Sequence, residues 1–187
     1  MKKIIFLDRD GVINVDTGYI YKIKDFRFEK NAVAGLRLLK SDGYQFIIIT
    51  NQSGIGCGYY TEEDFQKFND HVVAELEKKG IEILKTYFSP YHPEKGIGKY
   101  KKKTSCRKPG TGMLKQAEKD FDIDNSKSWI IGDKWADVKA GKNFDIKRIL
   151  VLTGKGGKSD PHHKTDVACV ADDLLAAAKF IINKANS

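Results

Sequence analysis

The sequence predicts an α/β fold: a Rossmann-like, three-layer α/β/α arrangement in which helices cover both faces of a mostly parallel sheet. Short apolar runs and amphipathic stretches alternate along the chain, and this alternation is typical of parallel sheets. The apolar runs are continuous, as expected for strands that are buried on both faces. The length of 187 residues fits a single domain over 1–187.

The first strand is predicted at IIFL (4–7), which stops at acidic residues. The segment 12–30 is rich in glycine and aromatic residues and too irregular for a long helix, so we expect a flap or a pair of short strands there. The next elements expected are a helix over 31–43 with Asn31 as its cap, a strand over 45–50, a helix over 61–80 and a strand over 83–88. The later elements expected are a helix over 112–121, a strand over 128–132, a helix over 135–143, strands over 148–152 and 167–170, and a helix over 174–182.

The positive charge of the chain is concentrated in one stretch. The net charge is +8, and residues 88–109 contain seven lysine or arginine side chains against one acid, Glu94. Such a local charge can steer a small phosphorylated substrate into a cleft or contact nucleic acid. No signal peptide is visible, and no apolar run reaches the ~20 residues that span a bilayer. The three cysteines lack paired spacing, which argues for reduced thiols rather than disulfides. Together, these features predict a cytoplasmic protein with no membrane contact.

Two aspartates follow the first predicted strand. Asp8 ends the strand and Asp10 lies two residues later, so an extended backbone directs both carboxylates to the same side. Neighbouring carboxylates repel each other unless a cation neutralises one and the other holds a proton. This pair therefore suits a nucleophile and a general acid, while the alternative is a turn that happens to be acidic.

Polar groups also follow the other predicted strands. TNQSGIGCG begins at Thr50, whose hydroxyl can donate to an oxyanion, and its glycines let backbone N–H groups approach a phosphate. RKPG contains Arg107 and Lys108, which can bind a dianion as a planar fork and a point charge. In GDKWAD, Asp133 and Asp137 are one helical turn apart if a helix starts there. Each motif alone can be a plain turn or helix start, but parallel strands bring all of them to one edge of the sheet.

Taken together, these motifs make the chain resemble the haloacid dehalogenase-type phosphatases. The resemblance runs from FLDRDGVINVDTGY through TNQSGIG and CRKPGTGM to IGDKWADVKAG and VLTGKG, over roughly residues 3–157. NVDTGY followed by DFRF resembles the heptose bisphosphate branch, and histidinol-phosphate phosphatase is a relative. The resemblance implies a haloacid dehalogenase-like fold. The spans between motifs are too short for an inserted cap domain, so the 12–30 flap and the 89–109 loop are expected to limit access.

The resemblance implies a role for each motif. Asp8 would attack phosphorus and become an aspartyl-phosphate, and Asp10 would protonate the leaving oxygen and later activate water. Magnesium would be held by the Asp8 carboxylate, the Asp10 main-chain carbonyl and Asp133. Asp137 would orient Lys108 or the metal shell. The residues implied in substrate binding are Thr50, Asn51, Gln52, Ser53, Arg107, Lys108, Asp16, Tyr19 and Lys134.

Two departures from the resembled family concern the loop and a glycine turn. The family holds a structural zinc with three cysteines and a histidine, and the positions that correspond in this chain are Ser89, Tyr91, Thr104 and Cys106. Only one of these four is a zinc ligand, so we expect no zinc and a loop held by Tyr91 packing, prolines and polar contacts. A rearranged site of His92 and Cys106 is the alternative. Cys57 replaces the usual arginine, which can remove a contact to the distal phosphate of the substrate.

The function predicted is therefore a magnesium-dependent phosphatase of a small sugar phosphate. The resemblance to the heptose branch implies that the reaction removes the 7-phosphate of D-glycero-D-manno-heptose 1,7-bisphosphate in the biosynthesis of nucleotide-activated heptose for lipopolysaccharide or surface glycans. The alternatives are histidinol phosphate as substrate, a polynucleotide 3′-phosphatase or nucleic-acid binder that uses the lysine-rich loop, and a catalytically silent relative. Nucleic acid is not expected, because Tyr100 is the only aromatic residue among those lysines. We expect a monomer, with Lys101, Lys102 and Lys103 solvated or steering substrate, and with His162 and His163 exposed.

Overall fold

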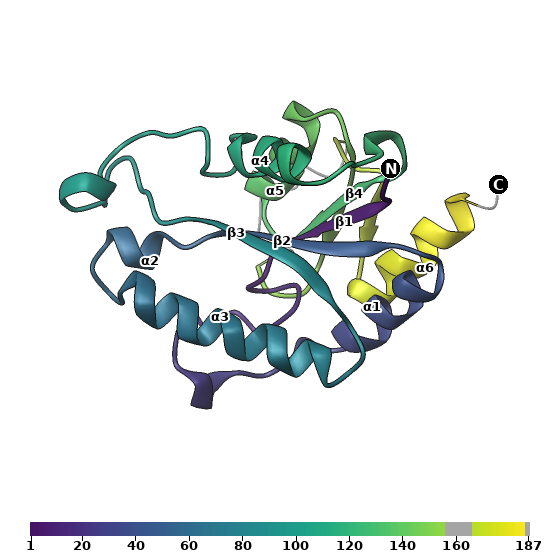
Figure 1. Ribbon diagram of the computed structural model, residues 1–187, viewed down its shortest axis with the longest axis horizontal. Coiled ribbons are helices and arrows are strands. Elements are labelled where there is room, and N and C mark those ends of the chain that lie inside the picture. Colours follow the sequence, from purple (N-terminus) through teal and green to yellow (C-terminus); the bar gives the residue numbers. More distant parts are fainter. Residues whose placement is uncertain (156–165, 186–187) are drawn as a thin grey trace.

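The computed structural model describes residues 1–155 and 166–185, and its centre is a six-stranded sheet (Figure 1). The strands pair in the order β3-β2-β1-β4-β5-β6, and each pairing is parallel. The strands are β1 (Ile4–Leu7), β2 (Gln45–Asn51), β3 (Ile83–Ser89), β4 (Trp129–Gly132), β5 (Lys147–Val151) and β6 (Cys169–Ala171). The predicted α/β fold with a parallel central sheet is confirmed.

Six α-helices of the described residues connect or follow these strands. They are α1 (Ala32–Ser41), α2 (Ser53–Gly56), α3 (Glu62–Glu77), α4 (Gly112–Asp120), α5 (Trp135–Asn143) and α6 (Leu174–Ala185). Short 3-10 turns lie at η1 (Ile23–Asp25), η2 (Gly98–Tyr100) and η3 (Asn125–Lys127). The structure confirms every strand and helix that the sequence predicts, and α2 is a short helix that the sequence analysis missed.

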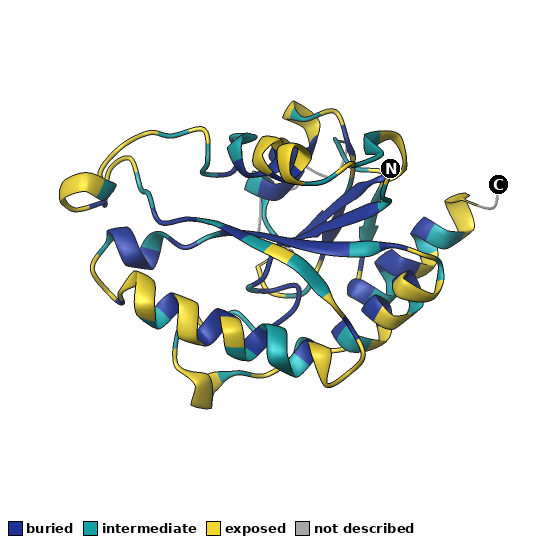
Figure 2. Ribbon diagram, viewed as in Figure 1, coloured by how far each residue is buried: buried dark blue, intermediate teal, exposed yellow. Residues whose placement is uncertain are grey.

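The alternation of side chains along each strand explains why the strands are apolar throughout. In β1, Ile5 and Leu7 pack into one buried cluster, while Ile4 and Phe6 pack into another. The first cluster contains side chains of α1, α3 and α6, and the second contains side chains of α4 and α5. The helices therefore form one layer on each face of the sheet, and the buried interior lies between them (Figure 2).

Of the two alternatives for the segment 12–30, the structure shows the flap and not the pair of strands: the segment contains η1 and single bridges from Asn14 to Asp10 and to Phe28. The prediction that the Asn31 side chain caps α1 is wrong. Asn31 precedes α1 in a left-handed conformation with φ 61° and does not cap the helix with its side chain. Its amide instead donates a hydrogen bond to Asp173 at 2.7 Å, which links the start of α1 to the segment before α6.

No helix within 1–155 or 166–185 is both long and apolar enough to cross a membrane. His162 and His163, which the sequence analysis expects to be exposed, lie outside the described residues.

Candidate active site

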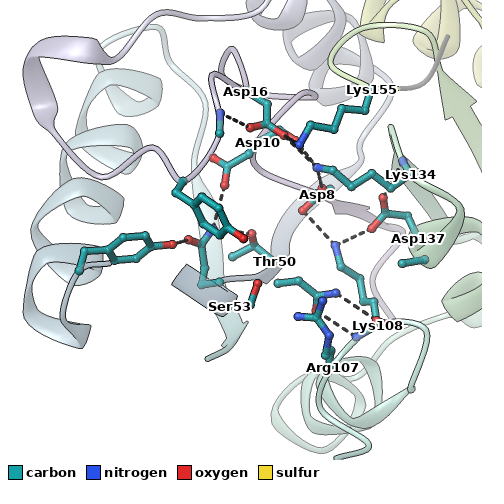
Figure 3. A pocket seen from close by; sticks show the side chains of 16 residues that line it. Asp8, Asp10, Asp16, Thr50, Ser53, Arg107, Lys108, Lys134, Asp137 and Lys155 are labelled. Carbon is teal, nitrogen blue, oxygen red and sulfur yellow. Dashed lines mark hydrogen bonds and ion pairs between the residues drawn. The ribbon is translucent and has the colours of Figure 1, made fainter. Parts of the chain in front are cut away.

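A cavity of about 280 Å³ opens at the edge of the sheet where β1, β2 and β4 end (Figure 3). Nearly all of the predicted catalytic and binding residues line it: Asp8, Asp10, Asp16, Tyr19, Thr50, Asn51, Gln52, Ser53, Arg107, Lys108, Lys134 and Asp137. Asp133, whose side chain is fully buried, is not among the residues that line the cavity. The parallel topology thus brings motifs up to 129 positions apart in the chain into one site.

Asp8 lies at the buried end of β1, where its backbone N–H bonds to Ile131 of β4 at 3.0 Å. Lys108 Nζ donates to Asp8 Oδ1 at 2.9 Å, and Lys134 Nζ lies 3.6 Å from Asp8 Oδ2. Burial alone would raise the pKa of Asp8, but the two ammonium groups lower it to about 2. Asp8 is therefore a carboxylate at neutral pH, as a nucleophile must be.

Lys108 joins Asp8 to Asp137 beneath the cavity (Figure 3). Its Nζ lies 2.5 Å from Asp137 Oδ1 and donates to the Ile49 carbonyl at 2.7 Å. Burial opposes the charge of Lys108, yet Asp137 and Asp8 raise its pKa, so the side chain stays an ammonium. Asp137 Oδ2 also accepts a hydrogen bond from the backbone N–H of Lys134 at 3.0 Å, at the start of α5.

Asp133 follows β4, and its carboxylate packs against the backbone of Gly11 and Gly154, where a larger residue would not fit. A Cβ atom at Gly11, where φ is +93°, would lie 2.4 Å from Asp133 Oδ2. That oxygen accepts a hydrogen bond from the backbone N–H of Lys155 at 2.8 Å. Burial and the charge of Asp8 raise the pKa of Asp133 to about 7. A neighbouring cation would therefore stabilise its ionised form.

Lys134 provides an ammonium beside this carboxylate. Its Nζ lies 3.2 Å from Asp133 Oδ1, 3.6 Å from Asp8 Oδ2 and 3.2 Å from the Asp10 main-chain oxygen. Burial alone would lower the pKa of Lys134, but Asp8, Asp133 and further carboxylates raise it. The ammonium therefore contacts the same three groups that the family resemblance assigns to magnesium.

The donor atoms fit a divalent cation. Asp8, Asp133 and Asp137 each bring a carboxylate oxygen to within 4.8 Å of the others, and no other such cluster occurs within the described ranges. Oδ1 of Asp133 is buried without a hydrogen-bond donor, although Lys134 lies close enough for an ion pair. Carboxylate and carbonyl oxygens are the ligands that Mg²⁺ prefers.

Asp10 is held in a separate network that faces the same cavity. Its Oδ1 accepts hydrogen bonds from Arg9 Nε at 2.9 Å and Asn14 Nδ2 at 3.0 Å. Its Oδ2 accepts from Arg9 Nη2 at 3.1 Å and Gln52 Nε2 at 2.9 Å. Gln52 in turn contacts Thr50 Oγ1 at 2.9 Å and accepts from the Tyr60 hydroxyl at 2.6 Å. The two aspartates of the D-x-D motif therefore have different surroundings, which permits different roles.

The predicted binding residues around the cavity differ in how free their polar groups are. Both ends of the Asn51 amide bind the main chain of Lys108, at 3.0 Å each. Asp16 lies 3.2 Å from Lys134 and 3.6 Å from Lys155. Arg107 donates to the Tyr91 carbonyl at 3.2 Å, and no carboxylate of the described residues forms an ion pair with it. Arg107 is thus the cation at the cavity that lacks an acidic partner within the described residues.

The loop 89–109 is held by aromatic and cationic contacts. The Tyr91 and Tyr100 ring centroids lie 6.1 Å apart, and Lys102 Nζ lies 4.5 Å from the Tyr91 ring centroid. Tyr100 donates to Glu62 of α3 at 2.5 Å. His92 Nδ1 accepts backbone hydrogen bonds from residues 94 and 95, and Cys106 is a free thiol. The expected packing of Tyr91 is confirmed, while the expectation of no zinc stays a prediction.

Comparison with known proteins gives the family. Residues 105–177 match the family described as HAD-hydrolase-like. The D-glycero-α-D-manno-heptose-1,7-bisphosphate 7-phosphatase of Photorhabdus laumondii is 38% identical over 179 residues, which cover 96% of each chain. The D-glycero-β-D-manno-heptose-1,7-bisphosphate 7-phosphatase of Pasteurella multocida is 44% identical over 156 residues, 83% of this chain and 84% of that protein. This chain belongs to the haloacid dehalogenase-like phosphatases.

A solved structure of this phosphatase family has the same fold. The D,D-heptose 1,7-bisphosphate phosphatase of B. bronchiseptica, crystallised with magnesium and phosphate, is similar with a TM-score of 0.80 and 26% identity. The similarity covers 97% of this chain and 99% of that one.

Sequence reasoning missed several residues of this phosphatase site. Arg9 and Asn14 bind Asp10 directly, Tyr60 binds Gln52, and Lys155 lines the cavity. The signal for Arg9 is its place between Asp8 and Asp10, since a charged residue at the end of a buried strand needs a partner. Nothing in the local pattern marks Tyr60, because its contact with Gln52 depends on how α2 turns the chain.

Proposed function

We propose that this protein is a magnesium-dependent phosphatase that removes the 7-phosphate of D-glycero-D-manno-heptose 1,7-bisphosphate. The observation that carries the proposal is the buried Asp8 carboxylate, held ionised between two ammonium groups at the floor of the cavity. Proteins named for this reaction share 38% and 44% of their residues with this chain over most of its length. We further propose a monomeric, single-domain enzyme of the cytoplasm that serves nucleotide-activated heptose biosynthesis for lipopolysaccharide or surface glycans.

The proposed reaction has two steps. Asp8 attacks phosphorus and forms an aspartyl-phosphate, while Asp10 gives its proton to the leaving sugar oxygen. Asp10, now a carboxylate, then takes a proton from a water that attacks the phosphorus. The P–O bond to Asp8 breaks, which frees inorganic phosphate and restores the Asp8 carboxylate. Mg²⁺, held by Asp8, the Asp10 carbonyl and Asp133, would neutralise charge on the phosphoryl group.

The assignment of substrate contacts starts from the residues that line the cavity. We assign Lys108, Thr50 and Ser53 to the transferred phosphoryl group, since they line the same cavity as Asp8 (Figure 3). Asn51 acts through its two hydrogen bonds to Lys108. Arg107 remains for the second phosphate of a bisphosphate substrate. Histidinol phosphate, the alternative substrate, has an ammonium group instead of a second phosphate, so Arg107 favours the heptose bisphosphate.

Phosphate release from a substrate panel tests this function. The panel contains both C1 anomers of the heptose 1,7-bisphosphate, histidinol phosphate and a 3′-phosphorylated oligonucleotide, each with Mg²⁺ or with EDTA. We expect the highest kcat/KM for one heptose anomer, and loss of activity in EDTA that Mg²⁺ restores. A higher kcat/KM for histidinol phosphate or the oligonucleotide would reject the proposed substrate, and full activity in EDTA would reject the metal.

The position of Lys134 leads to a prediction about the cation. Because its ammonium contacts the Asp8, Asp10 and Asp133 oxygens that would hold Mg²⁺, Lys134→Met should raise the affinity for Mg²⁺ without substrate roughly tenfold or more. Titration calorimetry on the phosphate-free protein measures this affinity. Lys155→Met is the matched control, because it removes an ammonium that lies 3.6 Å from Asp16 and keeps the backbone N–H that binds Asp133. Weaker Mg²⁺ binding by Lys134→Met would contradict the competition.

A further inference from the structure

Arg9 is a fully buried arginine between the two aspartates of the D-x-D motif, with a relative exposure of 0%. Its guanidinium carbon lies 4.8 Å from the ring centroid of Phe68 and 5.2 Å from that of Phe65, both on α3. Removing a guanidinium from water is costly unless other groups replace the lost hydration. The two rings do so in part, and they also fix where the guanidinium lies.

Further compensation comes from the Asp10 carboxylate. Arg9 donates two hydrogen bonds to it, from Nε to Oδ1 at 2.9 Å and from Nη2 to Oδ2 at 3.1 Å. A bidentate pair of this kind fixes the plane of the carboxylate as well as its distance. Asn14 and Gln52 add one donor to each oxygen. The orientation of Asp10 is therefore set by a cation that is itself held by α3.

We propose that Arg9 is the positioning residue of Asp10, the general acid of the proposed function on which this inference rests. When Asp10 gives its proton to the leaving oxygen, the P–O bond to the sugar breaks and Asp10 becomes an anion. Arg9, through its two hydrogen bonds to the carboxylate, stabilises that anion and keeps it aimed at the cavity. Arg9 itself does not line the cavity, so it acts through Asp10.

This role predicts a dependence on the leaving group. A sugar alkoxide is a poor leaving group and needs the proton from Asp10, whereas p-nitrophenolate leaves without it. Loss of an aligned general acid costs typically 10²- to 10⁴-fold. In kcat/KM, which reports formation of the aspartyl-phosphate and not its hydrolysis, that cost should fall mainly on the sugar phosphate. A general loss of folded protein would instead lower both rates by the same factor.

The experiment compares kcat/KM for the heptose bisphosphate and for p-nitrophenyl phosphate in the wild type, Arg9→Met, Arg9→Lys and Asp10→Asn. We expect Arg9→Met to lose at least about 100-fold on the sugar phosphate and less than about tenfold on the aryl phosphate. Arg9→Lys, which keeps the charge without the fork, should lie between it and the wild type. Thermal unfolding measures the folded fraction of each variant.

Phe68→Leu keeps the test decisive if Arg9→Met does not fold. It removes one ring beneath the guanidinium and should give a smaller loss that is again selective for the sugar phosphate. Equal losses on both substrates in Arg9→Lys and Phe68→Leu would overturn the positioning role. If Asp10→Asn loses activity equally on both substrates while the Arg9 variants lose it mainly on the sugar phosphate, the role of Asp10 as general acid is rejected. The failure of the proposed function is therefore distinguishable from the failure of the positioning role.

Discussion

Asp8→Asn is expected to lower kcat for phosphate release by at least about 10⁴-fold, the range seen when an enzyme loses its nucleophile. The amide has nearly the shape of the carboxylate but cannot attack phosphorus at neutral pH. Phosphate release measures the loss, and trapping of a hydroxylamine-sensitive phosphoryl group on the wild type, absent from Asp8→Asn, measures the intermediate. The protein should remain folded, because Lys108 still pairs with Asp137 at 2.5 Å.

Asp122→Asn is the matched control for this loss. It makes the same chemical change at an exposed carboxylate, which pairs with the N-terminal amine near the start of β1, away from the cavity. Its kcat should equal that of the wild type. Residual activity of Asp8→Asn above about 1% of the wild type would reject Asp8 as the nucleophile. Loss of a nucleophile lowers kcat by much more than about 100-fold.

The part of the site that the sequence predicts is the part determined by topology. Asp8 and Asp133 each follow a buried apolar strand, Thr50 is the last residue but one of another, and parallel strands end at a common edge. The strand order β3-β2-β1-β4 places those three ends side by side, so knowledge of the strands is nearly enough to assemble the carboxylates and the hydroxyl.

The part that could not be predicted depends on side-chain partners between distant segments. Whether Lys108 contacts Asp8, 100 positions away, depends on how the loop after β3 returns to the sheet. The same holds for Asn31, which sequence reasoning treats as a helix cap but which bonds to Asp173 across the α1–α6 contact. Local sequence patterns indicate which side chain can bond to a nearby backbone group. The pairs Lys108–Asp8 and Asn31–Asp173 depend instead on how distant segments pack.

Lys108→Met is expected to destabilise the protein by about 3–5 kcal/mol, because it removes the cation from a buried ion pair and leaves the carboxylates behind. The side chains of Lys108, Asp8 and Asp137 are 2%, 6% and 2% exposed, so water cannot replace the lost ammonium. For a chain of this length the loss corresponds to a fall in Tm of roughly 6–20 °C. Thermal unfolding without Mg²⁺ measures it, and kcat should also fall, because Lys108 orients Asp8.

The double variant Lys108→Met/Asp137→Asn separates the buried charge from lost packing. If the cost comes from the unpaired Asp137 carboxylate, neutralising it should recover part of the stability, so the double variant loses less than the sum of the single ones. Lys127→Met is the control, because its ion pair with Asp124 at 3.4 Å is at the surface and is worth at most about 1 kcal/mol. Strict additivity would contradict the unpaired Asp137 carboxylate as the source of the lost stability.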